Sequence, residues 1–188
     1  ELCVSQVSEE QKAELDLSCW THALSGAEPV RAETLRKFSD SFANNGFSWD
    51  SFYAVYGMAE TTLIITGGGS VERPMLETLS SQEPAQNRVK LLSDSGTKIK
   101  VRHSDAVEVV GVGQKVLDQE VILVDPDTRK RVSPESVGEI WVSGKHVGKG
   151  YWNNEALSEK TFRATIVNDD GGESSEAYLR TGDLACYI

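Results

Sequence analysis

The sequence predicts an α/β protein, in which a strand–helix–strand lobe with parallel pairing precedes a small barrel-like subdomain. Residues 17–66 hold an apolar run, a segment with helical spacing and a second apolar run, an order that indicates two parallel strands joined by a helix. Residues 106–188 hold short β-branched runs separated by turn residues, typical of a small barrel or curled sheet. We expect an α/β part at 1–69, an insertion-like segment at 70–105 and the β-rich subdomain at 106–188.

The first lobe begins with a short helix and a buried strand. Residues 8–11 (SEEQ) fit a capping box that would start the helix. Residues 17–24 read as a buried strand that leads into the loop 25–29 (SGAEP). A second helix should follow, with Pro29 in its first turn and a stop at residues 45–46 (NG).

The next strand leads into residues 54–63 (AVYGMAETTL), which carry several groups suited to a nucleotide. Gly57 would permit a sharp turn that presents Tyr56, backbone amides and Glu60. An aromatic ring can stack on a base, amides can bind a phosphate, and a carboxylate can hold Mg²⁺. Taken alone, these ten residues fit better with a buried tyrosine before an ordinary turn and a surface glutamate. Because parallel strands end at one edge of a sheet, loop 25–29 and Tyr56 should face one crevice.

The rest of the chain reads mainly as strands. Residues 70–105 lack a clear period and hold prolines, serines and mixed charges, which favours an insertion or a crossing segment. The elements expected beyond it are strands at 107–110, 120–124 and 139–142, a turn at 125–128, a helix that Asn153 or Asn154 caps and that ends near Phe162, and a strand from Tyr178 onward. Three aromatic residues should pack in the barrel and not touch a ligand: Trp141, Tyr151 and Trp152.

Composition excludes several classes of function. The chain of 188 residues is 39% hydrophobic and 26% charged, which suffices for one globular domain or two small lobes. Its net charge of −10 argues against nucleic acid as a partner, because nucleic-acid binders usually carry a basic patch. No apolar run approaches the ~20 residues of a membrane helix, and the three scattered cysteines indicate reduced thiols. We therefore expect a cytoplasmic protein without a membrane span.

Four motifs, in this order, resemble those of the adenylate-forming superfamily, whose members make acyl-AMP from ATP and a carboxylic acid. They are residues 25–29 (SGAEP), 56–61 (YGMAET), 138–144 (GEIWVSG) with 150–152 (GYW), and 178–183 (YLRTGD). Within the superfamily, the residues of these motifs most resemble those of the fatty acyl-AMP ligases. The resemblance implies that the chain is about the second half of the large N-terminal domain of such an enzyme.

The resemblance also implies a role for each site residue. The loop of Gly26, Ala27 and Glu28 would support the adenine through its backbone, and Tyr56 would stack on the base. Gly57, Met58 and Ala59 would lie along the bound nucleotide, Glu60 would be the catalytic Mg²⁺ ligand, and Asp183 would bond both ribose hydroxyls. A carboxylate can accept two hydroxyl protons at once, so the last role is chemically reasonable.

Two features bear on the subfamily. Ala59 stands where most acyl-CoA and amino-acid-activating relatives have threonine. The segment from Glu60 to Gly111 is longer than in typical acyl-CoA synthetases, and its extra residues lie where fatty acyl-AMP ligases carry an insertion. Val112 departs from that pattern, since many such ligases have cysteine there. The implied parent activates a fatty acid with ATP and Mg²⁺ and passes it to the thiol of an acyl carrier protein. The alternatives are an acyl-CoA synthetase, an amino-acid adenylation domain, or a non-catalytic binding or regulatory module with this fold.

The family's phosphate loop and catalytic lysine have no match in the sequence. No Ser/Thr/Gly-rich loop ends in a lysine, and the chain ends five residues after Asp183. Because electrostatic stabilisation is commonly the largest catalytic contribution, we expect these 188 residues to be a fragment that forms no acyl-AMP by itself.

Overall fold

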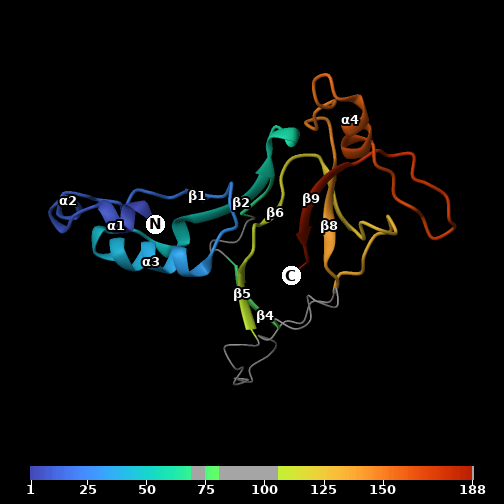
Figure 1. Cartoon of the computed structure of the whole chain (residues 1–188). Helices are drawn as coiled ribbons and strands as arrows, with labels where there is room; N and C mark the ends of the chain where they lie inside the picture. The colour runs from blue at the N-terminus through green and yellow to red at the C-terminus, as the bar shows by residue number, and fades with distance from the viewer. Residues whose placement is uncertain (69–74, 81–105, 188) are drawn as a thin grey trace. The chain divides into compact units, whose positions relative to one another are not determined.

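The computed structural model describes residues 1–68, 75–80 and 106–187 (Figure 1). Its helices and strands, in chain order, are α1 (Leu2–Gln6), α2 (Glu9–Ala13), β1 (Ala23–Ser25), α3 (Ala32–Phe42), β2 (Phe52–Met58), β3 (Leu63–Gly67), β4 (Leu76–Ser80), β5 (Ala106–Val110), β6 (Gln114–Lys115), β7 (Glu120–Val124), β8 (Gly138–Ser143), α4 (Glu155–Phe162) and β9 (Leu179–Ala185). Three 3-10 turns accompany them: η1 (Ala43–Asn45), η2 (Trp49–Ser51) and η3 (Ala59–Thr61).

The chain divides into two compact units that interleave along the sequence. The first unit comprises Glu1–Tyr56, Thr66–Glu77 and Glu108–Gln114. The second comprises Gly57–Ile65, Thr78–Val107 and Lys115–Ile188. Residues 81–105, most of the expected insertion, lie outside the described residues, and the division at 69 and 105 stays a prediction.

The pairing of strands confirms the α/β class. One sheet has the order β1–β2–β3–β6, and β1 runs parallel to β2 with Ser25 opposite Ala54. Strands β4 and β5 form a two-stranded sheet, and β7, β8 and β9 form an antiparallel sheet in that order. In the part of the chain that the structure describes, these three strands form an open sheet, so of the two expected forms, a small barrel or a curled sheet, the closed barrel is wrong.

Local signals predicted the first capping box of this unit correctly but misplaced the starts of β1 and α3. The capping box is present, since the Ser8 N–H donates to Gln11 Oε1 over 2.9 Å and the Gln11 N–H donates to Ser8 Oγ. Strand β1 begins only at Ala23, because residues 17–20 form a turn closed by the Trp20 N–H and the Leu17 carbonyl. Helix α3 begins at Ala32 after the N-cap Arg31, so the expected place of Pro29 in its first turn is wrong.

Aromatic side chains build the core of the first unit. Phe42 and Phe47 are buried at 2% and 5% exposure, and Phe38 packs on both with ring centroids 4.7 and 4.9 Å away. Phe52, at the start of β2, lies 5.0 Å from Phe47. Gly46 adopts a left-handed φ of 82° directly after η1, which confirms the predicted helix stop. This core fixes α3 against the strand that leads to Tyr56.

A separate core supports the open sheet of the second unit. Ile122, Val124, Trp141, Ile166 and Tyr178 pack together, and Trp141 is fully buried as expected. Asn154 is the predicted cap of α4, since its side chain accepts from the Leu157 N–H.

The expected burial of Trp152 is wrong, because its side chain is 90% exposed. Tyr151 packs against Phe162, with ring centroids 5.1 Å apart, and the turn that follows leaves Trp152 exposed to solvent.

In the part of the chain that the structure describes, no helix has the length and apolar character needed to cross a membrane.

Candidate nucleotide-binding site

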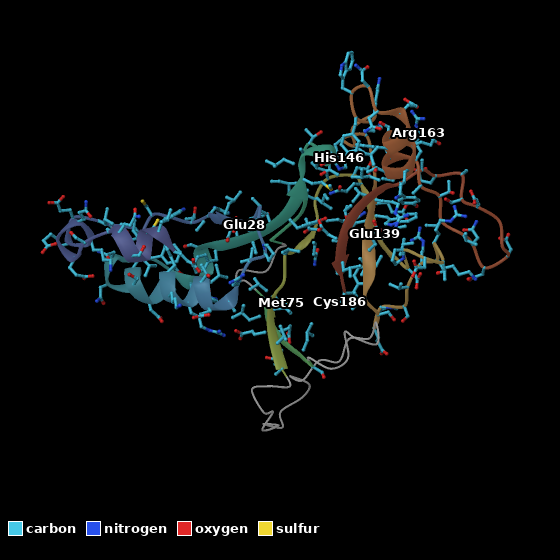
Figure 2. The ribbon with its side chains drawn as sticks, in the orientation of Figure 1. Glu28, Met75, Glu139, His146, Arg163 and Cys186 are labelled. Carbon is cyan, nitrogen blue, oxygen red and sulfur yellow. The ribbon has the colours of Figure 1, made fainter. Side chains whose placement is uncertain are left out.

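In the first unit, the loop after β1 lies against the strand that carries Tyr56. A Cβ on Gly26 would lie 2.7 Å from the Val55 carbonyl oxygen, so only glycine permits this approach. Ala27 follows with a left-handed φ of 66°, and the Glu28 side chain is exposed (Figure 2). The structure thus brings the predicted Gly26 loop beside residue 55, next to the half-buried Tyr56.

The predicted turn at Gly57 is wrong. Strand β2 continues through Met58, and the turn comes two residues later at η3, followed by left-handed φ values of 55° at Thr62 and 95° at Leu63. Gly57 is needed for another reason, because a Cβ there would lie 1.6 Å from the Leu63 carbonyl oxygen. A glycine inside a strand indicates close backbone approach as often as a turn, and here it is the approach of β3.

Glu60 lies in η3 of the second unit, where a distant segment holds the turn in place. The Tyr151 hydroxyl donates to Glu60 Oε1 over 2.7 Å, and the Gly148 N–H donates to the Glu60 carbonyl over 2.7 Å. The Thr62 hydroxyl donates to the His146 carbonyl, also over 2.7 Å. Accepting the hydrogen bond, Glu60 raises the pKa of Tyr151 and keeps that phenol protonated. Tyr151 therefore does more than the packing expected of it.

The donor chemistry at Glu60 suits a metal ion that is shared with a ligand. Among the described residues, no group of three or more histidine, cysteine, aspartate and glutamate side chains could hold a metal by itself. Mg²⁺ typically takes one or two protein carboxylates and completes its shell with water and phosphate oxygens. A carboxylate has about four acceptor positions, so the bond from Tyr151 leaves Glu60 with capacity for such an ion.

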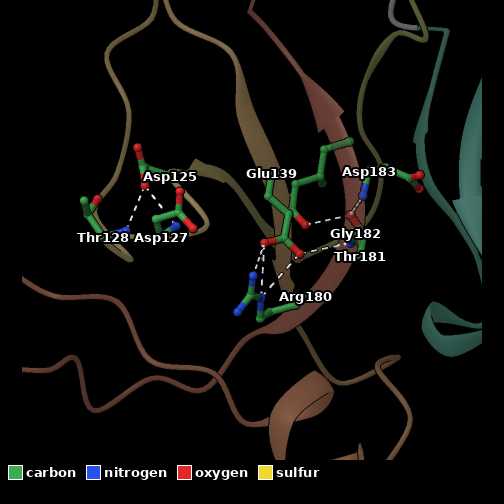
Figure 3. A network of polar contacts seen from close by, with 9 residues as sticks. Asp125, Asp127, Thr128, Glu139, Arg180, Thr181, Gly182 and Asp183 are labelled. Atoms are coloured by element: carbon green, nitrogen blue, oxygen red, sulfur yellow. Dashed lines mark hydrogen bonds and ion pairs between the residues drawn. The ribbon is translucent and has the colours of Figure 1, made fainter. Parts of the chain in front are cut away.

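Asp183 lies in an irregular part of β9, within the strand that the sequence predicted from Tyr178 onward. Glu139 pairs with Leu184 and Trp141 pairs with Arg180, so β9 has three residues opposite the single residue Ile140. The Thr181 hydroxyl donates to the Ile140 carbonyl over 2.8 Å and accepts from the Asp183 N–H over 3.1 Å (Figure 3). The result is a bulge that presents Asp183 on an exposed position.

Glu139 is a residue of this site that the sequence did not single out. It is 4% exposed and accepts from Arg180 Nη2 over 2.7 Å and from the Gly182 N–H over 3.0 Å (Figure 3). Burial opposes ionisation of the carboxyl, yet these donors outweigh it and hold the pKa of Glu139 below its ordinary value. The available signal was a charged residue inside an apolar strand, which requires a buried partner.

The structure thus arranges the predicted residues in two sets. Tyr56 and the Gly26 loop belong to the first unit, whereas residues 57–60 and Asp183 belong to the second. Ala59 is exposed, and Met58 and Glu60 are half-buried.

Comparison with known proteins shows the family. The sequence profile of the AMP-binding enzymes matches residues 1–152, and the chain belongs to this family. A medium-chain-fatty-acid–[acyl-carrier-protein] ligase of Teredinibacter turnerae is 38% identical over 190 residues, which cover 100% of this chain and 28% of that protein. A second such ligase, from Moorena producens, is 36% identical over 98% of this chain and 30% of its own length.

The fold has a solved counterpart. A fatty acyl-adenylate ligase from L. pneumophila, determined in complex with acyl adenylate and pyrophosphate, matches with a TM-score of 0.83 and 40% identity. The match covers 97% of this chain and 30% of that one. The chain therefore spans a little under a third of the length of the relatives it matches.

Proposed function

We propose that this chain is part of a longer ligase that activates a fatty acid as acyl-AMP with ATP and Mg²⁺, then transfers the acyl group to the thiol of an acyl carrier protein. The observation that carries the proposal is the placement of two carboxylates. Glu60 and Asp183 both lie on irregular backbone: the half-buried Tyr151 donates to the Glu60 carboxylate, and the buried Glu139 accepts from the Gly182 N–H beside Asp183.

In this proposal each residue takes the role that its match to a family motif implies. Tyr56 stacks on the adenine, and the loop at Gly26 covers the base through its backbone. Asp183 accepts the two ribose hydroxyls, and the backbone of residues 57–59 runs along the phosphates. Glu60 holds Mg²⁺, which when bound supplies positive charge at the phosphates.

The choice of acid and acceptor rests on the relatives. Two of them are ligases of medium-chain fatty acids and acyl carrier proteins, and a third makes fatty acyl-adenylate. Ala59 fits the same choice, because an alanine leaves contact with the α-phosphate to the backbone. Assay of the full-length protein for acyl-AMP, acyl carrier protein product and acyl-CoA separates the acceptors, and efficient acyl-CoA formation would favour the synthetase alternative.

Variants of the two carboxylates test the proposal in the full-length protein. Asp183→Ala should weaken ATP binding by about 1.5–3 kcal/mol, the scale of hydrogen bonds to a charged group. Glu60→Gln should lower the rate of acyl-AMP formation and shift its Mg²⁺ dependence. Asp169→Ala, which removes an exposed acid from a loop of the same unit, is the matched control. ATP affinity and turnover that match the control in both variants would contradict the proposal.

A further inference from the structure

The bulge in β9 interrupts the backbone hydrogen bonds between β8 and β9, so other contacts must hold its shape. Thr181, Gly182 and Asp183 face one residue of β8, so the regular ladder of hydrogen bonds is interrupted there. Gly182 adopts a left-handed φ of 78°, a conformation that alternates with more extended ones at little steric cost in glycine. The sheet therefore constrains this segment less than a regular ladder would.

Glu139 supplies that order from inside the sheet. One carboxylate oxygen accepts from the Gly182 N–H over 3.0 Å, and the other accepts from Arg180 Nη2 and Nε over 2.7 and 3.1 Å. The side chains of Glu139 and Arg180 are only 5% and 25% exposed, and the guanidinium lies 5.2 Å from the centre of the Trp141 ring. A single buried carboxylate thus joins residues on both sides of Thr181 to the rigid core.

We propose that Glu139 is a positioning residue, which holds the 181–183 bulge in the shape that presents the Asp183 carboxylate to both hydroxyls of a nucleotide ribose. This inference rests on the proposed function of Asp183. Two hydrogen bonds to neighbouring hydroxyls require the carboxylate to be placed within a fraction of an ångström. Loss of the Glu139 charge leaves Arg180 without its buried ionic partner and weakens the bond from the Gly182 N–H, so the bulge can shift while Asp183 itself is unchanged.

The experiment compares ATP with 2′-deoxy-ATP in the full-length protein. The quantity measured is the dissociation constant of 2′-deoxy-ATP divided by that of ATP. Only groups that contact the ribose hydroxyls change this ratio. Glu139→Gln should weaken ATP binding about tenfold and 2′-deoxy-ATP binding much less, so the ratio should fall toward that of Asp183→Ala. Glu120→Gln is the control, since Glu120 pairs with Arg131 over 2.6 Å in the same sheet and contacts no part of the bulge that the structure describes. Its ratio should stay at the parental value.

A second variant guards against a protein that does not fold. Glu139→Gln combined with Arg180→Gln replaces the ion pair by neutral amides and leaves no unpaired buried charge. This double variant should show the same fall in the ratio, with thermal unfolding measured in parallel.

The outcomes separate the inference from the function on which it rests. A lowered melting temperature with an unchanged ratio in both Glu139 variants would show that Glu139 is merely structural and would overturn the inference. An unchanged ratio in Asp183→Ala would show that Asp183 does not read the ribose, and the proposed function would then fail with it.

Discussion

Replacing Tyr151 with phenylalanine tests whether Glu60 is held for a metal ion. The change removes one hydroxyl, which donates to Glu60 Oε1 over 2.7 Å, and leaves the ring that packs on Phe162 at 5.1 Å. The Gly148 N–H still holds the backbone of the turn. Any effect of Tyr151→Phe therefore reports the orientation of one carboxylate and not the loss of a side chain.

The magnitude follows from the bond and its surroundings. A hydrogen bond to a charged group contributes about 1.5–3 kcal/mol when solvent is excluded. Glu60 and Tyr151 are both half-buried, so a value of about 1 kcal/mol is appropriate, which is about a fivefold change in an equilibrium constant. The bond to Glu60 raises the pKa of Tyr151 above its ordinary 10.0. The phenol therefore stays protonated, and the effect should not vary with pH through the neutral range.

The assay is a Mg²⁺ titration of acyl-AMP formation by the full-length protein at saturating ATP and fatty acid, with thermal stabilisation by Mg·ATP as an independent readout. The variant should need about fivefold more Mg²⁺. Tyr178→Phe is the matched control, because the Tyr178 hydroxyl donates to Glu120 over 2.8 Å in the same unit. A Mg²⁺ requirement that is the same in Tyr151→Phe and in the parent would refute the reasoning.

Two further predictions concern stability. Gly57→Ala would put a Cβ 1.6 Å from the Leu63 carbonyl oxygen and force β2 from β3, so denaturant unfolding should show a loss of about 3 kcal/mol or more. Gly171→Ala, with nothing within 4 Å of its Cβ and a φ of 82°, should cost only about 1–2 kcal/mol; equal losses would contradict this account of Gly57. Burial, and then the bond to Glu120, raise the pKa of Tyr178 from 10.0 to about 12. The neutral phenol therefore contributes stability that is present below pH 10 and is lost as the pH rises through about 12. In urea unfolding, Tyr178→Phe should lack this alkaline loss of stability. A pH profile identical to that of the parent would contradict the prediction.

The sequence predicted features that depend on a few neighbouring residues. The capping box at Ser8, the stop of α3 at Gly46 and the cap of α4 at Asn154 each involve partners within four positions. The turn after β7 is similar, since Asp125 Oδ1 accepts from the backbone N–H groups of Asp127 and Thr128 (Figure 3). Spacing and residue type carry such information completely.

Features that depend on distant partners were not predictable in this way. Tyr151 and Glu60 are 91 positions apart, and their bond requires the loop after β8 to lie against η3. Gly57 reads as a turn until the approach of β3 is known. The partner of Glu139 follows only from the register of β8 and β9, which contains a bulge that no local pattern marks. The partners that hold Glu60 and Asp183 in place therefore follow from the fold and not from the local sequence.

The motif at residues 138–144 and 150–152 has no assigned ligand contact, but its residues support both candidate carboxylates. Glu139, near its start, holds the bulge that carries Asp183, and Tyr151 with Gly148, near its end, hold the turn that carries Glu60. The two supports differ in kind, because one is a buried ion pair and the other a half-buried hydrogen bond. The first fixes a strand in the core and the second leaves the carboxylate partly open to solvent. That difference matches the ligands proposed for them, since a ribose needs fixed acceptors, whereas a hydrated metal ion needs a carboxylate that keeps room for water and phosphate.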